Sequence, residues 1–182
     1  MGGIGFSTGA VARADFRRAL DLLRGQAINV VELSALRIIF TPGRWQHLGD
    51  RLLVENMDRR KPIGRNVGEL RQIFDWLPEA RFCFDIGHAR QVDPSMTEAS
   101  LLLGAFGDRL AEVHISEVIT ASRHDPISPN AVIAFQSVAK HLPEAVPIVL
   151  ETLIDKGQSE IKREVQRARE ALSVVRQLRL QT

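Results

Sequence analysis

The segment RFCFDIGHA, residues 81–89, carries the pattern that decides the fold. It opens with a short apolar run, Arg81–Asp85, of the length and composition of a buried strand. The run ends on an acidic residue, and His88 follows three residues later. In a parallel α/β sheet, active sites are built at the carboxyl ends of strands. The segment therefore predicts a strand whose last residues belong to a functional site.

The same pattern, a short apolar run that ends on an ionisable residue, occurs three more times. These runs end at Glu55, His114 and Glu151, so that with Asp85 the successive separations are 30, 29 and 37 residues. Each separation is about one strand–helix unit. Because the carboxyl ends of parallel strands gather on one face, we expect the four side chains to meet. We call them the strand-end cluster.

Short apolar runs alternate with longer segments of helical period along the whole chain, which is typical of a parallel α/β fold. Seven runs predict strands: Ile4–Ser7, Asn29–Leu33, Ile38–Phe40, Leu52–Glu55, Arg81–Asp85, Ala111–Ile115 and Pro147–Glu151. We interpret residues 1–182 as a single domain, since no linker, repeat or low-complexity tract divides them.

Three predicted helices begin at recognisable caps. Asn66 with Glu69, and Ser95 with Glu98, fit the capping-box spacing. Ser128 precedes a proline, which is favoured at the first helical position.

The join between the second and third predicted strands is unusually short. Only residues 34–37 separate them, whereas a crossover between parallel strands takes about a dozen residues or more. Either these strands are not sequential parallel neighbours, or a connecting segment is missing from this region.

The composition is that of an ordinary globular domain. The 182 residues carry a formal charge of +2, with 45% hydrophobic and 25% charged residues and one cysteine. These values exclude disordered, collagen-like and disulfide-stapled classes, and no apolar run has the length of a membrane span. We expect a cytoplasmic protein without a membrane partner. From residue 156 onward seven basic residues face three acidic ones, which we interpret as a solvated helix face and not as a nucleic-acid site.

Three carboxylates brought together without a cation would repel one another, and their pKa values would rise. A divalent metal ion resolves this conflict. An oxygen-rich set with one imidazole suits Mn²⁺, Mg²⁺ or Co²⁺, with Zn²⁺ and Fe²⁺ as alternatives. Such an ion can stabilise a developing enediolate while a nearby carboxylate moves a carbon-bound proton, or it can activate water.

Four segments resemble the xylose-isomerase-like TIM-barrel superfamily, which includes sugar and sugar-phosphate isomerases and epimerases as well as apurinic-site endonucleases. They are LVEN at 53–56, DIGHA at 85–89, VHIS at 113–116 and IVLET at 148–152. The resemblance implies a (β/α) barrel and a strand-end cluster that binds one divalent metal. It also implies that Glu55 and Glu151 form the acid/base pair, and that His88, Arg123 and His124 contact substrate.

The chain also departs from the superfamily pattern. Barrels of this type run to about 250 residues, so we expect an incomplete barrel of about seven parallel strands with an internal deletion near 34–38. The endonuclease branch has an Asp two residues before the histidine at position 124, where this chain has Ser122.

Three functions therefore remain open. The first is a metal-dependent isomerase or epimerase of a small sugar or sugar phosphate, and the second is a phosphodiester hydrolase. The third is a shortened, non-catalytic binding protein. Open sheet edges favour association between copies, so we also expect a homo-oligomer.

Overall fold

A computed structural model describes residues 4–7, 30–32, 46–154 and 158–173. Six strands form one parallel sheet in the order β2-β1-β8-β5-β4-β3. Their bounds are β1 Ile4–Ser7, β2 Val30–Glu32, β3 Leu53–Glu55, β4 Arg81–Asp85, β5 Leu110–Ile115 and β8 Ile148–Leu150. The seventh predicted strand, Ile38–Phe40, and the short join at 34–37 lie outside the described residues.

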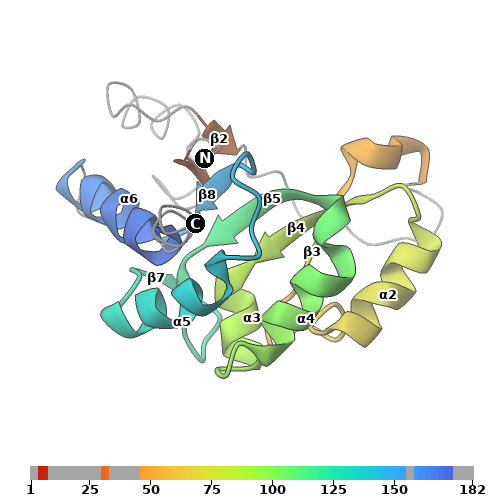
Figure 1. Ribbon diagram of the computed structural model, residues 1–182, viewed down its shortest axis with the longest axis horizontal. Coiled ribbons are helices and arrows are strands. Elements are labelled where there is room, and N and C mark those ends of the chain that lie inside the picture. The colour runs from red at the N-terminus through yellow and green to blue at the C-terminus, as the bar shows by residue number, and fades with distance from the viewer. Residues whose placement is uncertain (1–3, 8–29, 33–45, 155–157, 174–182) are drawn as a thin grey trace, which may run out of the picture.

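Helices follow the strands, as the alternating pattern predicted. The α-helices are α2 Val67–Trp76, α3 Ile86–Val92, α4 Thr97–Phe106, α5 Pro129–Ala139 and α6 Gln158–Leu172, and the short 3-10 helices are η2 Gln46–Arg51 and η3 Gly107–Arg109. Figure 1 shows β8, β5, β4 and β3 side by side, with α2, α3, α4 and α5 along one side of them. The fold is therefore α/β with parallel strands, and within the described residues the sheet stays open between β2 and β3.

Side chains alternate along β4 between the helix side and the inner side of the sheet. Phe82 and Phe84 belong to the main hydrophobic core beneath the helices. Since successive strand residues point to opposite faces, Cys83 and Asp85 face the inner side. Phe74 and Phe106, from α2 and α4, pack their rings against Phe82. This core fixes the position at which β4 delivers its last residue.

Two of the three predicted helix caps are confirmed. The Asn66 side chain accepts a hydrogen bond from the backbone N–H of Glu69 at the start of α2, and Ser128 accepts one from Ala131 at the start of α5. Pro129 occupies the first turn of α5, as expected.

The predicted cap at Ser95 is wrong. Helix α4 begins after Met96, which adopts a left-handed conformation (φ 62°) and makes no side-chain cap. Asp93 instead accepts hydrogen bonds from the backbone N–H groups of Ser95 and Glu98. The Glu98 carboxylate accepts from the Val67 N–H at the start of α2, at 2.7 Å. Asp93 thus accepts the hydrogen bonds that the predicted capping box at Ser95 would have used. Glu98 instead connects the start of α4 to the start of α2.

A small antiparallel hairpin follows β5, and the sequence pattern did not predict it. Its strands are β6 Glu117–Val118 and β7 His124–Asp125. The turn between them includes Ser122 with a positive φ of 54°. This hairpin brings His124 back toward the carboxyl edge of the sheet.

None of the helices within the described residues combines the length and the apolar character needed to cross a bilayer.

Candidate functional site

The strand-end cluster assembles at the carboxyl edge of four neighbouring strands. Asp85 and His114 are paired in register at the ends of β4 and β5. Glu151 follows β8, and its backbone N–H donates to the Ile115 carbonyl. Glu55 ends β3. One potential ligand atom from each of the four residues lies within 4.8 Å of all the others. The geometric part of the expectation, that the four side chains meet, therefore holds.

The His114 imidazole lies at the centre of this arrangement. Its Nδ1 is 3.4 Å from Oε1 of Glu55 and 3.5 Å from Oε2 of Glu151. Its Nε2 is 2.9 Å from Oε1 of Glu112. Since an ionised carboxylate only accepts hydrogen bonds, Nε2 carries the proton of this contact. The other ring nitrogen faces the two glutamates.

Two buried polar atoms of the cluster have no hydrogen-bond partner within the described residues. They are Oδ2 of Asp85 and Nδ1 of His114. Buried polar atoms in native proteins are almost always satisfied, so an unsatisfied pair calls for a ligand. Three carboxylates and one imidazole offer the oxygen and nitrogen donors that divalent metals take. The residues present therefore fit a divalent ion.

The electrostatics of the cluster are strongly perturbed. Burial raises the pKa of Asp85 to about 8. Burial alone would also raise the pKa of Glu55, but hydrogen bonds and charges of His114 and His88 outweigh it and hold this pKa well below its usual range. For His114, contacts with Cys83 and the surrounding carboxylates override burial and raise the pKa. Protons thus compensate the crowded acids, and a divalent cation would take over that role on binding.

His88 is positioned by the strand-to-helix turn at the end of β4. Its backbone N–H donates to Oδ1 of Asp85 at 2.6 Å, which makes Asp85 the N-cap of α3. The ring Nδ1 donates to the backbone carbonyl of Asn56 at 3.0 Å, because a carbonyl only accepts. Burial alone would lower the pKa of His88, but the charges of Asp85 and Glu55 and the Asn56 carbonyl raise it to about 10.

His124 reaches the same site from β7. Its Nδ1 is 2.8 Å from Oγ of Ser116 and 3.4 Å from Oε2 of Glu151. Burial lowers its pKa, so the ring is neutral near pH 7. The rings of His88 and His124 meet edge to face at 5.3 Å, and with Asp85 they form a second group that could hold a metal ion.

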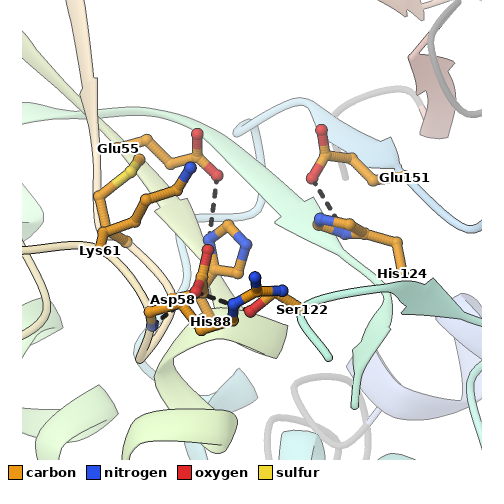
Figure 2. A pocket seen from close by; sticks show the side chains of 9 residues that line it. Glu55, Asp58, Lys61, His88, Ser122, His124 and Glu151 are labelled. Atoms are coloured by element: carbon orange, nitrogen blue, oxygen red, sulfur yellow. Dashed lines mark hydrogen bonds and ion pairs between the residues drawn. The ribbon is translucent and has the colours of Figure 1, made fainter. Parts of the chain in front are cut away.

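A cavity of about 500 Å³ opens onto the cluster. Figure 2 shows Glu55 and Glu151 on opposite sides of it, with the His88 ring beneath Glu55 and the His124 ring beneath Glu151. Asp85 and His114, which do not line this cavity, are 0% and 5% exposed. The remaining lining residues are Met57, Asp58, Arg60, Lys61 and Ser122.

Only two of the three residues that were predicted to contact substrate line the cavity. His88 and His124 line the cavity, but Arg123 does not. The Arg123 guanidinium forms a two-point contact with the Asp125 carboxylate, at 2.7 and 3.0 Å, on the exposed side of the hairpin. Arg123 directly precedes β7, and its contact with Asp125 holds its side chain away from the cavity that His124 lines.

Sequence reasoning missed a network that joins the loops around the cavity. Asp58 is 4% exposed, and its Oδ1 accepts from the backbone N–H of Arg60 and from Oγ of Ser122. Arg60 also donates to the Ala121 carbonyl. These contacts connect the loop after β3 to the turn of the β6–β7 hairpin. No local motif marks them, since the partners are about sixty residues apart in the chain.

Asn56 is the other positioning residue that the sequence pattern did not single out. Its side-chain amide donates to the Asp85 carbonyl and accepts from the Asp85 N–H, both at 2.8 Å. It is fully buried. Its place directly after Glu55 in the LVEN segment was the only available signal.

A family model described as xylose isomerase-like TIM barrel matches residues 12–178 of the chain. The search of curated proteins found no significant match to the chain.

Proposed function

Because the chain belongs to the xylose isomerase-like TIM barrel family, we propose that the strand-end cluster binds one divalent metal ion and that this site isomerises or epimerises a small carbohydrate or carbohydrate phosphate. The two unsatisfied buried atoms, Asp85 Oδ2 and His114 Nδ1, are the observation that carries the metal proposal. The placement of Glu55 and Glu151 on opposite sides of the cavity favours proton transfer over simple metal storage.

The metal ion, when bound, supplies a Lewis acid that polarises a substrate oxygen. The chain's own carboxylates then move the proton. The pKa values of Glu55 and Glu151 both lie below the ordinary value, because contacts with histidines outweigh burial, so both groups are ionised near pH 7. One of them takes a proton from the carbon beside a carbonyl, and the bonding electron pair moves onto the carbonyl oxygen.

The two reactions differ in where the proton returns. Return of the proton to the former carbonyl carbon, with transfer of the hydroxyl proton of the original carbon to the former carbonyl oxygen, interconverts an aldose and a ketose. Delivery of a proton to the opposite face of the original carbon inverts its configuration, and the second glutamate, ionised at rest, supplies that proton after it has taken one up from water. His88 and His124 line the same cavity, each beside one of the two glutamates, and are placed to donate hydrogen bonds to substrate oxygens.

Two measurements test this proposal. Isothermal titration with Mn²⁺ and Co²⁺ should show one ion per chain, and binding should be abolished in His114→Asn and strongly weakened in Glu151→Gln. Proton NMR in D₂O, with a panel of ketoses and ketose phosphates, should show deuterium incorporation beside the carbonyl. The matched control is Glu79→Gln, which changes an exposed glutamate that is outside the site. Wild-type binding retained in both site variants would contradict the metal assignment.

Phosphodiester hydrolysis is the second candidate, and the Asp85–His88–His124 group favours it, since it could hold an additional metal. Ser122 weighs against it. The Ser122 hydroxyl donates to Asp58 at 2.7 Å and offers no carboxylate to that group. Cleavage of abasic-site DNA with Zn²⁺ or Mn²⁺, lost in His88→Asn, would favour this candidate over isomerisation. Metal binding with neither activity would favour the non-catalytic binding protein.

A further inference from the structure

We propose that Glu112 is a positioning residue for His114: it holds the imidazole by its Nε2–H so that Nδ1 faces the other three members of the strand-end cluster. This inference rests on the proposed metal site and assigns a residue outside the cluster. Glu112 does not line the cavity, and no local motif marks it.

The strand itself brings the two side chains together. Glu112 and His114 are two residues apart on β5, so both point to the inner face of the sheet. Val113 between them points to the helices and joins the hydrophobic core. The strand therefore places the Glu112 side chain next to the imidazole on the same face, and the contact of 2.9 Å forms within one strand.

The contact decides which imidazole nitrogen is available to a metal. A neutral imidazole has one N–H and one lone pair, and a carboxylate partner on Nε2 fixes the proton there. When a metal ion displaces the other ring proton, Nδ1, which lies 3.4 Å from Oε1 of Glu55 and 3.5 Å from Oε2 of Glu151, is therefore the nitrogen that binds it. Carboxylate partners of this kind orient metal-bound histidines, and their loss typically weakens metal binding about 10–100-fold.

Burial shields the contact between Glu112 and His114 from water. The side chains of His114 and Glu112 are 7% and 19% exposed. Without Glu112, the Nε2–H would lose its carboxylate acceptor, and the ring could turn to use either nitrogen. Cys83 is the neighbour on the adjacent strand, paired in register with Glu112. Its sulfur is a weaker hydrogen-bond acceptor than the Glu112 carboxylate.

Cys83, Glu112 and His114 could alternatively hold a metal ion of their own. In that case Glu112 would be a ligand and not a positioning residue. The two roles predict different stoichiometries, which makes them separable by experiment.

Two substitutions test the proposal. Glu112→Gln keeps an oxygen that can accept the Nε2–H, whereas Glu112→Val removes the acceptor and preserves β-propensity. With Co²⁺ in titration calorimetry, we expect Glu112→Val to weaken binding about 10–100-fold and Glu112→Gln to weaken it less. Asp108→Asn, an exposed acid before the start of β5, is the matched control and should bind like wild type.

NMR supplies a reading independent of affinity and turnover. In the ¹⁵N-labelled, Zn²⁺-loaded protein, His114 should show a protonated Nε2 in wild type and in Glu112→Gln. In Glu112→Val the Nε2 proton has lost its acceptor, so its signal should broaden through faster exchange with solvent, or the proton should appear on Nδ1 if the ring turns and binds the metal through Nε2. Circular dichroism and a thermal melt of each variant identify any loss that comes from unfolding.

The outcomes separate the two proposals. If Glu112→Val binds the metal as tightly as wild type does, the role of Glu112 is overturned and the proposed metal site stands. Wild type that binds no divalent metal would overturn both proposals. Two Co²⁺ ions per chain, with a thiolate charge-transfer band lost in Cys83→Ala, would make Glu112 a ligand and also overturn the inference.

Discussion

Asn56 does more for the site than its size suggests. Its amide makes two hydrogen bonds to the backbone of Asp85 and so ties the end of β3 to the end of β4. Asn56 directly follows Glu55, and the residue to which it binds is Asp85, so both of its neighbours are members of the strand-end cluster. This side chain therefore helps to fix the distance between Glu55 and Asp85, together with the backbone pairing of β3 and β4.

We expect Asn56→Ala to destabilise the protein by roughly 2–4 kcal/mol, because it leaves the buried N–H and carbonyl of Asp85 unsatisfied. Asn66→Ala, which removes one helix cap, is the matched control and should cost about 1 kcal/mol. Urea unfolding measures both, and metal titration should show weaker binding only in Asn56→Ala. Equal destabilisation in the two variants would contradict this prediction.

Gly87 is required by a close approach and not by its dihedral angles. A Cβ at this position would lie 2.5 Å from the Ser116 carbonyl oxygen and 2.8 Å from Cγ2 of Val118. The first contact is with backbone, so the first turn of α3 would have to move away from β5 and β6. His88 is the next residue and would move with it.

Gly87→Ala should therefore destabilise the protein by about 1–3 kcal/mol through overpacking. Gly104→Ala is the matched control, since nothing lies within 4 Å of its added Cβ and the residue is inside α4. It should stabilise the protein by up to about 1 kcal/mol, because alanine favours helix over glycine. Thermal or urea unfolding tests both signs, and a neutral Gly87→Ala would show that α3 can shift freely.

At the scale of elements, α6 is attached to the rest of the protein by a buried carboxylate. Glu164 is 0% exposed and accepts from the Ile127 N–H at 2.9 Å and the Thr152 hydroxyl at 3.3 Å. Thr152 directly follows Glu151. Helix α6 thus braces both the segment before α5 and the segment that carries the last member of the strand-end cluster.

Burial raises the pKa of Glu164 above its ordinary value of 4.5. The folded state consequently holds this proton more tightly than the unfolded state, and the group contributes more to stability as pH falls through its folded pKa toward 4.5. We expect the stability of wild type relative to Glu164→Gln to increase between pH 7 and pH 5 in urea unfolding. Glu170→Gln, on the same helix, is the matched control. A difference that stays constant with pH would contradict the prediction.

The elements also show what sequence reasoning can and cannot reach. Apolar runs gave Ile4–Ser7 and Arg81–Asp85 with their observed bounds, because a buried strand has a strong, local signature. The cap at Ser95 failed because Asp93 competes for the same N–H groups, and two acceptors so close in sequence cannot be ranked without geometry. The β6–β7 hairpin has strands of two residues, too short for any periodic pattern.

The same contrast holds for the site. The meeting of the strand-end cluster was predictable, since the sheet topology alone gathers strand ends. Asn56 and the Asp58–Ser122 contact were not, because they depend on loop conformation and on partners distant in sequence. The metal-binding and catalytic roles of these residues stay predictions until they are measured.

At the scale of the whole molecule, the proposed metal should stabilise the fold by mass action. A ligand that binds only the folded state at 100 times its dissociation constant adds about 2.7 kcal/mol. Mn²⁺ or Co²⁺ should therefore raise the thermal midpoint of wild type and leave that of His114→Asn unchanged. An equal shift in both proteins would indicate binding elsewhere. Light scattering on the same samples tests the expected homo-oligomer.

Asp85 divides its two oxygens between a helix and the cluster. Oδ1 accepts the His88 N–H at the start of α3, while Oδ2 is the unsatisfied atom that faces the other ligands. A cation that draws on one oxygen pulls on the carboxylate whose other oxygen caps the helix. The amide hydrogen of His88 therefore reports occupancy: its exchange with solvent deuterium should slow when the ion binds, which gives a probe of the loaded state that requires neither substrate nor chromophore.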